Sequence, residues 1–367
     1  MKKTPLILCM IFLSAVGCQS VPQLLPENKI ITPTPTVLDQ TPIGQPTTLE
    51  QSKLAPIVET KPIADKPNTE IYVLEEQTTN DILTPVQGKD YWNVDVNKFV
   101  NQFYRSHDDK YDFLMVFPLD MLPAYTSNVI NREVKGIGID SVFSNNATKN
   151  LKAVVLSDSY RIWYGTKPNP PNFDDNLRTI SLHEIGHYWL DYINKPMGWN
   201  GDFGHYPYNL DLFSGDSSFV DPMAYYQWID SNDQYKCVNG NLTSHKFSKL
   251  SLYLMGFIPA ESVPPIYLQQ LKDKPNDDYY NTWGPNCDQP ADFLSTNTIT
   301  IQDVVKKVGD RVPTVSDSQK NFKVGFVILA PKGQSVPPNF IEYVKKYQSA
   351  LPGDWNQATE GLSTISY

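Results

Sequence analysis

The chain has 367 residues and a formal net charge of −9. An acidic chain of this kind is a poor partner for nucleic acid, because affinity there comes largely from basic groups that neutralise phosphates. Every aromatic residue except Phe12 lies at or after Tyr72, whereas residues 19–68 hold nine of the 30 prolines. We therefore expect one folded domain over residues 69–367, which is long enough for a sizeable core.

Residues 1–18 are typical of an export signal, with Lys2 and Lys3 ahead of a short apolar stretch and small residues after it. The apolar stretch is too short to span a bilayer. Residues 14–18, SAVGC, resemble the lipobox of bacterial lipoproteins, although Ala15 stands where that family prefers leucine. The resemblance implies cleavage before Cys18 and lipidation of its thiol. An ordinary secretory leader with an unrelated cysteine is the alternative.

Residues 19–68 are rich in Pro and Thr and contain no aromatic side chain, which predicts a disordered tether. Loss of Lys2 and Lys3 would leave 29 basic and 40 acidic residues, a formal charge of −11. Membrane contact would then come from the lipid rather than from a basic patch. We expect a lipid-anchored protein of the cell envelope that faces the periplasm or the exterior, on the outer membrane if the host has two membranes.

Two cysteines remain after the leader and the lipid site are assigned. Cys237 and Cys287 form an even pair in an oxidising compartment, so a disulfide is the expected state. A reactive thiol or a two-cysteine zinc site is the alternative.

The folded part predicts an α+β domain with a mixed sheet. Apolar residues at helical spacing predict a helix at 96–104, and apolar runs at 112–117 and 151–156 predict buried strands. A central helix is expected from about Asn176 to Ile193, ending before Pro196. The remaining expected elements are a helix at 248–256, a strand at 322–330 and a helix at 340–350.

The central helix carries the motif His-Glu-Ile-Gly-His at residues 183–187. Residues i and i+4 share one helical face about 5–6 Å apart, so His183 and His187 can bind one metal ion. Imidazole nitrogens are ordinary zinc ligands. Glu184 is rotated by about 100° from His183, which places it beside the metal as a general base for water. Two core histidines bonded to the backbone are the alternative.

A catalytic zinc site needs a third protein ligand. No Glu occurs between Glu184 and Glu261, and the metzincin pattern would place His where Ile193 stands. Asp191 lies about 12 Å from His183 along a helix axis, too far for one ion. His205, in a glycine-rich polar loop, is the preferred candidate. The reserves are Asp202, Asp211 and Asp221.

Four segments resemble an uncharacterised group of bacterial lipoprotein-type zincins: HEIGHYW at 183–189, GHY at 204–206, DPMAYYQW at 221–228 and FSKLSLYLMGFIPAESVPP at 247–265. The likeness runs from about Tyr111 to the C-terminus. It implies a zincin-like domain, with His205 as a ligand and Met223 in a turn beneath the metal. It also implies that strand 151–156 is the sheet edge that pairs with extended substrate. Tyr188 and Tyr206 stand where this group has Arg and Trp.

The expected activity is a zinc metallopeptidase acting on protein or peptide outside the cytoplasm. Tyr225 and Tyr226 are candidates to donate a hydrogen bond to the oxyanion, with packing as the alternative. His107 and His245 have no partner pattern and receive no role. The rival functions are amide hydrolysis on peptidoglycan or glycan, and a catalytically silent surface-binding protein with a structural metal. The intact Glu184 argues against the silent form.

Overall fold

The computed structural model describes residues 70–367 except 90, 121, 123–124, 140–142, 158–173, 191, 200–204, 208, 214–217, 225, 232–233, 240–243 and 272–292. Among the helices so described, none has both the length and the hydropathy to cross a membrane. The expected leader, the tether and Cys18 lie outside the described residues.

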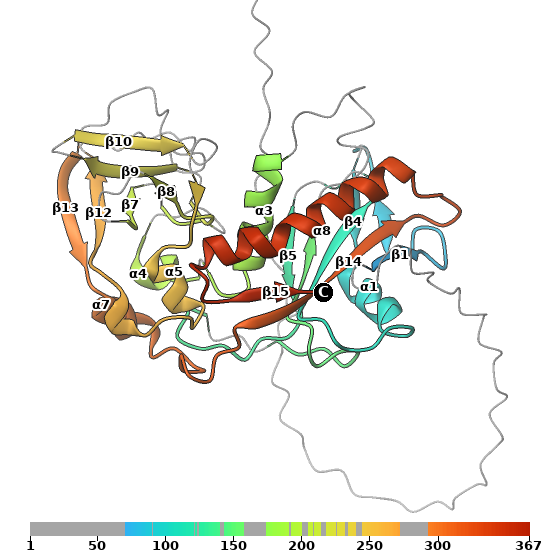
Figure 1. Cartoon of the computed structure of the whole chain (residues 1–367), viewed down its shortest axis with the longest axis horizontal. Coiled ribbons are helices and arrows are strands. Elements are labelled where there is room, and N and C mark those ends of the chain that lie inside the picture. The colour runs from blue at the N-terminus through green and yellow to red at the C-terminus, as the bar shows by residue number, and fades with distance from the viewer. Residues whose placement is uncertain are drawn as a thin grey trace, which may run out of the picture.

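A mixed six-stranded sheet forms one side of the described chain, at the right in Figure 1. Its order is β1 (Ile71–Glu75), β14 (Asn321–Ala330), β4 (Phe113–Pro118), β6 (Ala153–Leu156) and β5 (Thr126–Val129), and β15 (Thr364–Ser366) pairs with the start of β14. The first four strands are parallel, whereas β5 runs antiparallel to β6 at one edge. The domain is therefore α+β with a mixed sheet, as the sequence predicts.

Helices cover both faces of this sheet, which explains why β4 is apolar at every position. Phe113, Met115 and Phe117 join the core that contains residues of α3 (Asp174–Gly186) and α8 (Pro338–Ala358). Leu114 and Val116 point to the other face, where the core contains residues of α1 (Val96–Phe103). In Figure 1, α8 crosses the sheet and α3 stands beside it.

Short elements lie on the side of α3 away from the main sheet (Figure 1). They are β7 (Leu210–Asp211), β8 (Phe219–Val220), β9 (Tyr226–Ser231), β10 (Gln234–Asn239), β11 (Ser244–His245), β12 (Ile266–Leu271), β13 (Phe293–Ile299), α4 (Asn194–Met197), α5 (Lys249–Leu254), the 3-10 helix η2 (Ala260–Ser262) and α7 (Ile301–Val308). The strands form small sheets, β13-β12-β7, β10-β9 and β11-β8. On the main-sheet side, β2 (Leu83–Pro85) and β3 (Trp92–Val94) form a hairpin next to α1.

Most expected elements are confirmed, but two helices have different ends. The central helix does not reach Ile193: α3 ends at Gly186, and i→i−3 bonds tighten the following turn. Pro196 lies inside α4, in its first turn, where a missing N–H breaks no helical bond. Helix α8 continues past residue 350 through Pro352, because Trp355 beyond it is fully buried.

The expectation that residues 151–156 form the edge of the sheet is wrong. Residues 153–156 form a strand, but β6 lies inside the sheet between β4 and β5. The antiparallel edge strand is β5, which no feature of the sequence singled out. It packs against α3, as β6 does. The edge position depends on strand order, and a buried apolar run carries no information about order.

Candidate metal site

The end of helix α3 carries the histidine motif into the interior. The N–H of His187 donates to the carbonyl of His183 at 3.1 Å, so the helical turn continues past Gly186. One ligand atom from each of His183, Glu184 and His187 lies within 4.8 Å of the others. Among the described residues, no other three His, Cys, Asp or Glu side chains bring their ligand atoms so close. The two imidazole ring centres are 4.4 Å apart. The local helix thus brings two nitrogens and one carboxylate together.

A turn at residues 221–224 fixes the orientation of His183. Nδ1 of His183 lies 2.8 Å from the carbonyl oxygen of Pro222. A carbonyl can only accept, so Nδ1 carries the proton and Nε2 is left as the lone-pair nitrogen. Hydrogen bonds of this kind hold the ring of a metal-binding histidine in one tautomer.

His205 lies beside the two motif histidines. Its ring is nearly parallel to that of His183, at 4.8 Å and 17°, and 6.2 Å from that of His187. The side chain of Asn194 donates to the carbonyl of His205 at 2.7 Å, which fixes this segment against α4. His205 is not in the group whose donor atoms lie within 4.8 Å. Its proximity agrees with the expectation, and its role as a ligand stays a prediction.

The site is largely buried, with His187 partly exposed, and this burial favours the neutral form of its histidines. His183 and His205 are 4% exposed and Glu184 is 1% exposed. Burial lowers the pKa of His183 to about 4, against the opposing effect of its bond to Pro222. Burial, and then the neighbouring histidines, hold the pKa of His187 and of His205 well below the usual range. Neutral imidazole is the form that binds a metal ion.

The reserve aspartates that the structure describes are engaged with the protein itself. Asp221 is fully buried, and its carboxylate accepts hydrogen bonds from the main chain of Met223 and from Ser248 and Ser251. Burial raises the pKa of Asp221, and these bonds oppose the shift. Asp211 lies in β7 and accepts from the N–H of Phe213 at 3.0 Å. Neither belongs to the donor group of the motif.

For the other residues expected to be functional, the structure does not test the expected role. Asp202, Tyr225 and Cys287 lie outside the described residues, as does Cys18. The remaining two are described as parts of strands: Tyr226 begins β9 and Cys237 lies in β10. Their roles in oxyanion binding and in a disulfide therefore stay predictions.

The structure adds residues around the helix end that the sequence did not indicate. The hydroxyl of Tyr192 donates to the carbonyl of His187 at 2.7 Å. The buried guanidinium of Arg132 lies 4.6 Å from the ring centre of Tyr192 and 4.9 Å from that of Phe143. Its Nη1 reaches the carbonyl of Tyr188 at 3.5 Å, and a cation is favourable at the carbonyl end of a helix. No local pattern could have found the Arg132 contacts, since Arg132 lies 56 residues before Tyr188, whereas the contact between Tyr192 and His187 spans five residues.

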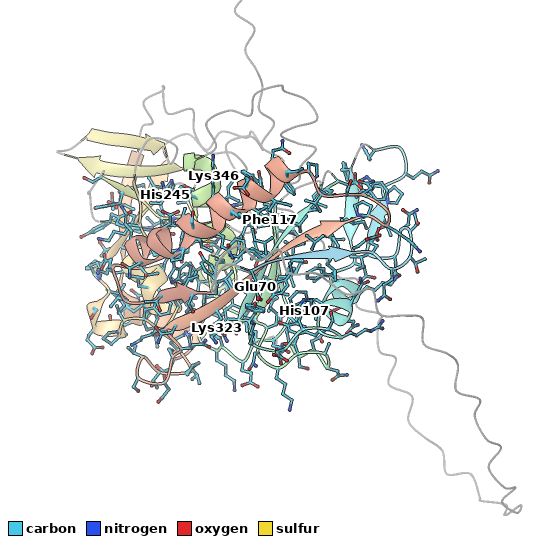
Figure 2. All side chains as sticks on the ribbon, turned by 45° about the vertical axis from the view of Figure 1, so that its right-hand side comes forward. Glu70, His107, Phe117, His245, Lys323 and Lys346 are labelled. Atoms are coloured by element: carbon cyan, nitrogen blue, oxygen red, sulfur yellow. The ribbon has the colours of Figure 1, made fainter. Side chains whose placement is uncertain are left out.

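The two histidines without an expected role differ in position. Figure 2 places His107 near α1, far from His245. His107 stacks on Phe103 at 4.1 Å between ring centres, which makes it part of the α1 packing. His245 in β11 pairs with Val220 in β8, and Val220 directly precedes the 221–224 turn that holds His183. A charge on His245 would lower the pKa of His183, so the two lie close enough to interact.

Searches of family models, curated proteins and solved structures return no match to this chain.

Proposed function

We propose that this chain is a zinc-dependent hydrolase of the zincin type that cleaves peptide bonds outside the cytoplasm. One observation carries the proposal: the end of α3 holds two histidine nitrogens and a carboxylate within 4.8 Å of one another, with His183 and Glu184 buried and His187 partly buried. Such a group on a helix matches the donors and the base that metal-assisted hydrolysis needs.

The donor set suits zinc better than a hard cation. Calcium and magnesium prefer sites built from oxygen atoms, whereas neutral imidazole suits zinc. His183 and His187 supply two nitrogens, and His205 is the third ligand in this proposal. The hydrogen bond from Nδ1 of His183 to the carbonyl of Pro222 leaves Nε2 as the nitrogen that would bind the ion. A site with three protein ligands leaves a position for substrate or water.

Glu184 is the general base in this proposal. The metal, when bound, supplies Lewis acidity and lowers the pKa of water. Glu184 accepts a proton as the water oxygen attacks the carbonyl carbon of the substrate. The bond between that carbon and nitrogen then breaks, and Glu184 returns the proton to the leaving nitrogen. Burial of the carboxylate excludes bulk water that would compete for this proton.

Strand β5 supports a peptide among the possible amide substrates. It is an antiparallel edge strand that packs against α3, and within the described part of the chain it pairs with β6 alone. An extended peptide can add to such an edge through main-chain hydrogen bonds. Glycan amides do not offer a continuous ladder of this kind. The lipid at Cys18 and the tether would hold the site outside the cytoplasm.

The test compares wild type with Glu184→Gln on a proteome-derived peptide library and on purified peptidoglycan. We expect peptide cleavage by wild type, and loss of cleavage with zinc retained in the variant. Hydrolysis of amide bonds in peptidoglycan alone, seen as newly released amino groups, would favour the second class of substrate. Zinc binding without cleavage of either substrate would favour the silent surface protein and contradict the proposal.

A further inference from the structure

The turn at residues 221–224 touches the site twice. The carbonyl of Pro222 accepts the hydrogen bond of His183, and Met223 lies against Gly186 near the end of α3. The turn follows β8 in a region of short elements and has no regular structure of its own. Something outside the turn must therefore fix its position, and the contacts of Asp221 identify it.

The carboxylate of Asp221 joins the turn to helix α5. Oδ1 accepts from the N–H of Met223 at 2.9 Å, and Oδ2 accepts from the N–H of Ser248 at 2.8 Å. Oδ2 also accepts from the hydroxyl of Ser251 at 2.7 Å. Three donors on two oxygens match an ionised carboxylate, which is acceptor-only. An amide could not replace it, because its NH₂ group would face a donor.

The same carboxylate reaches the His205 segment through Ser251. The single proton of Ser251 points at Asp221, so the hydroxyl of Tyr206, 3.2 Å away, donates to the Ser251 oxygen. The N–H of Tyr206 also donates to the carbonyl of Met223 at 3.0 Å. The neighbour of His205 is thus attached at two points to the elements that Asp221 joins.

We infer that Asp221 is a positioning residue of the metal site, which orients His183 through Pro222 and places His205 through Ser251 and Tyr206 without touching the ion. The inference rests on the proposed function. It assigns a role to a carboxylate that the sequence suggested as a reserve ligand. Outer contacts of this kind change metal affinity by about 10–100-fold when they are removed.

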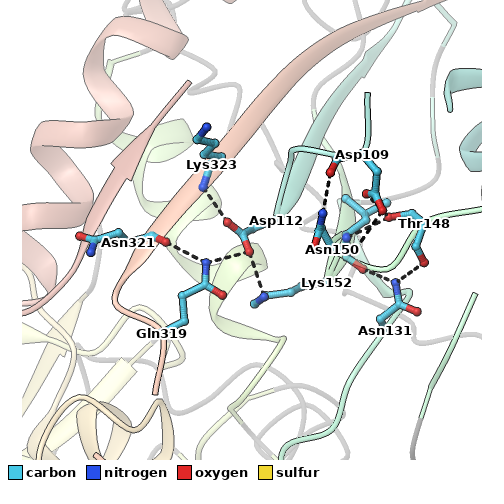
Figure 3. Close-up of polar contacts among 10 residues, drawn as sticks. Asp109, Asp112, Asn131, Thr148, Asn150, Lys152, Gln319, Asn321 and Lys323 are labelled. Atoms are coloured by element: carbon cyan, nitrogen blue, oxygen red, sulfur yellow. Dashed lines mark hydrogen bonds and ion pairs between the residues drawn. The ribbon is translucent and has the colours of Figure 1, made fainter. Parts of the chain in front are cut away.

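Asp112 provides a matched control. It is a buried carboxylate with three donors, namely Nζ of Lys152 at 2.9 Å, Nε2 of Gln319 at 2.9 Å and the N–H of Lys323 at 2.8 Å (Figure 3). It joins the starts of strands of the main sheet and makes no contact with the turn. Asp112→Asn therefore disturbs a similar network while leaving Pro222 in place.

The experiment measures release of zinc to a chelator, and the visible spectrum of the cobalt(II)-substituted protein, well below the melting temperature of each variant. We expect Asp221→Asn to weaken zinc affinity about 10–100-fold, seen as faster release to the chelator, and to change the cobalt spectrum. Ser251→Ala should act in the same direction, and it keeps the test available if Asp221→Asn does not fold. Asp112→Asn should lower the melting temperature and leave both metal readouts at the wild-type values.

Three results overturn the inference. Wild-type release and spectra in both Asp221→Asn and Ser251→Ala would overturn it and leave the proposed function standing. Loss of the metal in Asp221→Asn with wild-type behaviour of Ser251→Ala would make Asp221 itself a ligand. A wild-type protein that binds neither zinc nor cobalt would overturn both the inference and the proposed function.

Discussion

Met223 packs directly against Gly186, the last residue of helix α3. A Cβ atom built on residue 186 would lie 3.0 Å from the Sδ atom of Met223, closer than side chains normally approach. The glycine inside the histidine motif therefore serves close packing: it lets the 221–224 turn approach the helix between His183 and His187. This contact predicts different effects for the same substitution at two helical glycines.

Gly186→Ala should destabilise the metal-free protein by about 1 kcal/mol, because the overpacking cost exceeds the gain in helix propensity. Gly353→Ala is the control. It lies inside α8 with nothing within 4 Å of an added Cβ, and it should stabilise by about 0.5–1 kcal/mol. Urea unfolding measures both. Equal changes in the free energy of unfolding at the two sites would show that the Met223 side chain moves aside without cost.

His183→Ala and His187→Ala should each abolish stoichiometric zinc, because each removes a nitrogen from a site that has few donors. Glu184→Gln should retain the metal, since the carboxylate acts as a base in our proposal. His107→Ala is the control, since it removes an imidazole that stacks on Phe103 near α1. Elemental analysis of purified protein gives the result. Stoichiometric zinc in the double variant of His183 and His187 would remove the basis for the proposal.

His205→Ala should weaken zinc binding by orders of magnitude and leave the circular dichroism spectrum unchanged. The reason is its position, with its ring 4.8 Å from that of His183. Competition with a chelator measures the affinity. The matching variants are Asp211→Ala and Asp202→Ala. If His205→Ala keeps its zinc and one of these loses it, the third ligand is that aspartate.

Cys18→Ala should move the protein from the membrane fraction to the soluble fraction, or leave its leader uncleaved. The expected lipid on this cysteine provides the attachment, and the formal charge of −11 expected after leader cleavage disfavours binding to anionic lipid in its place. Fractionation with detergent partition measures the change, and Cys9→Ala serves as the control. Normal processing with unchanged membrane partition would show that the lipid is elsewhere.

Cys237 and Cys287 should form a disulfide in exported protein. Closing a loop of about 50 residues should stabilise the fold by about 4 kcal/mol in the chain-entropy model. Mass spectrometry of unreduced digests detects the linked peptides, and denaturation with and without reductant measures the stabilisation. Two alkylated thiols in exported protein would refute the pairing.

Local patterns in the sequence predicted local structure well. The helical spacing that includes Phe99 and Phe103 and the apolar run from Phe113 correspond to α1 and β4. The placement of His183, Glu184 and His187 together also follows from the sequence, because a helical turn alone sets residues i and i+4 side by side. These features depend on chain geometry within a few residues.

The tertiary structure decided everything that depends on distant segments. Strand order made β5 the sheet edge, and burial of Trp355 carried α8 through Pro352. Packing placed the carbonyl of Pro222 against His183 and turned Asp221 toward α5. The sequence therefore indicates which residues can bind a metal ion, because that choice is local. It cannot indicate what orients them, because each orienting contact joins segments whose approach is set only by burial of the shared core.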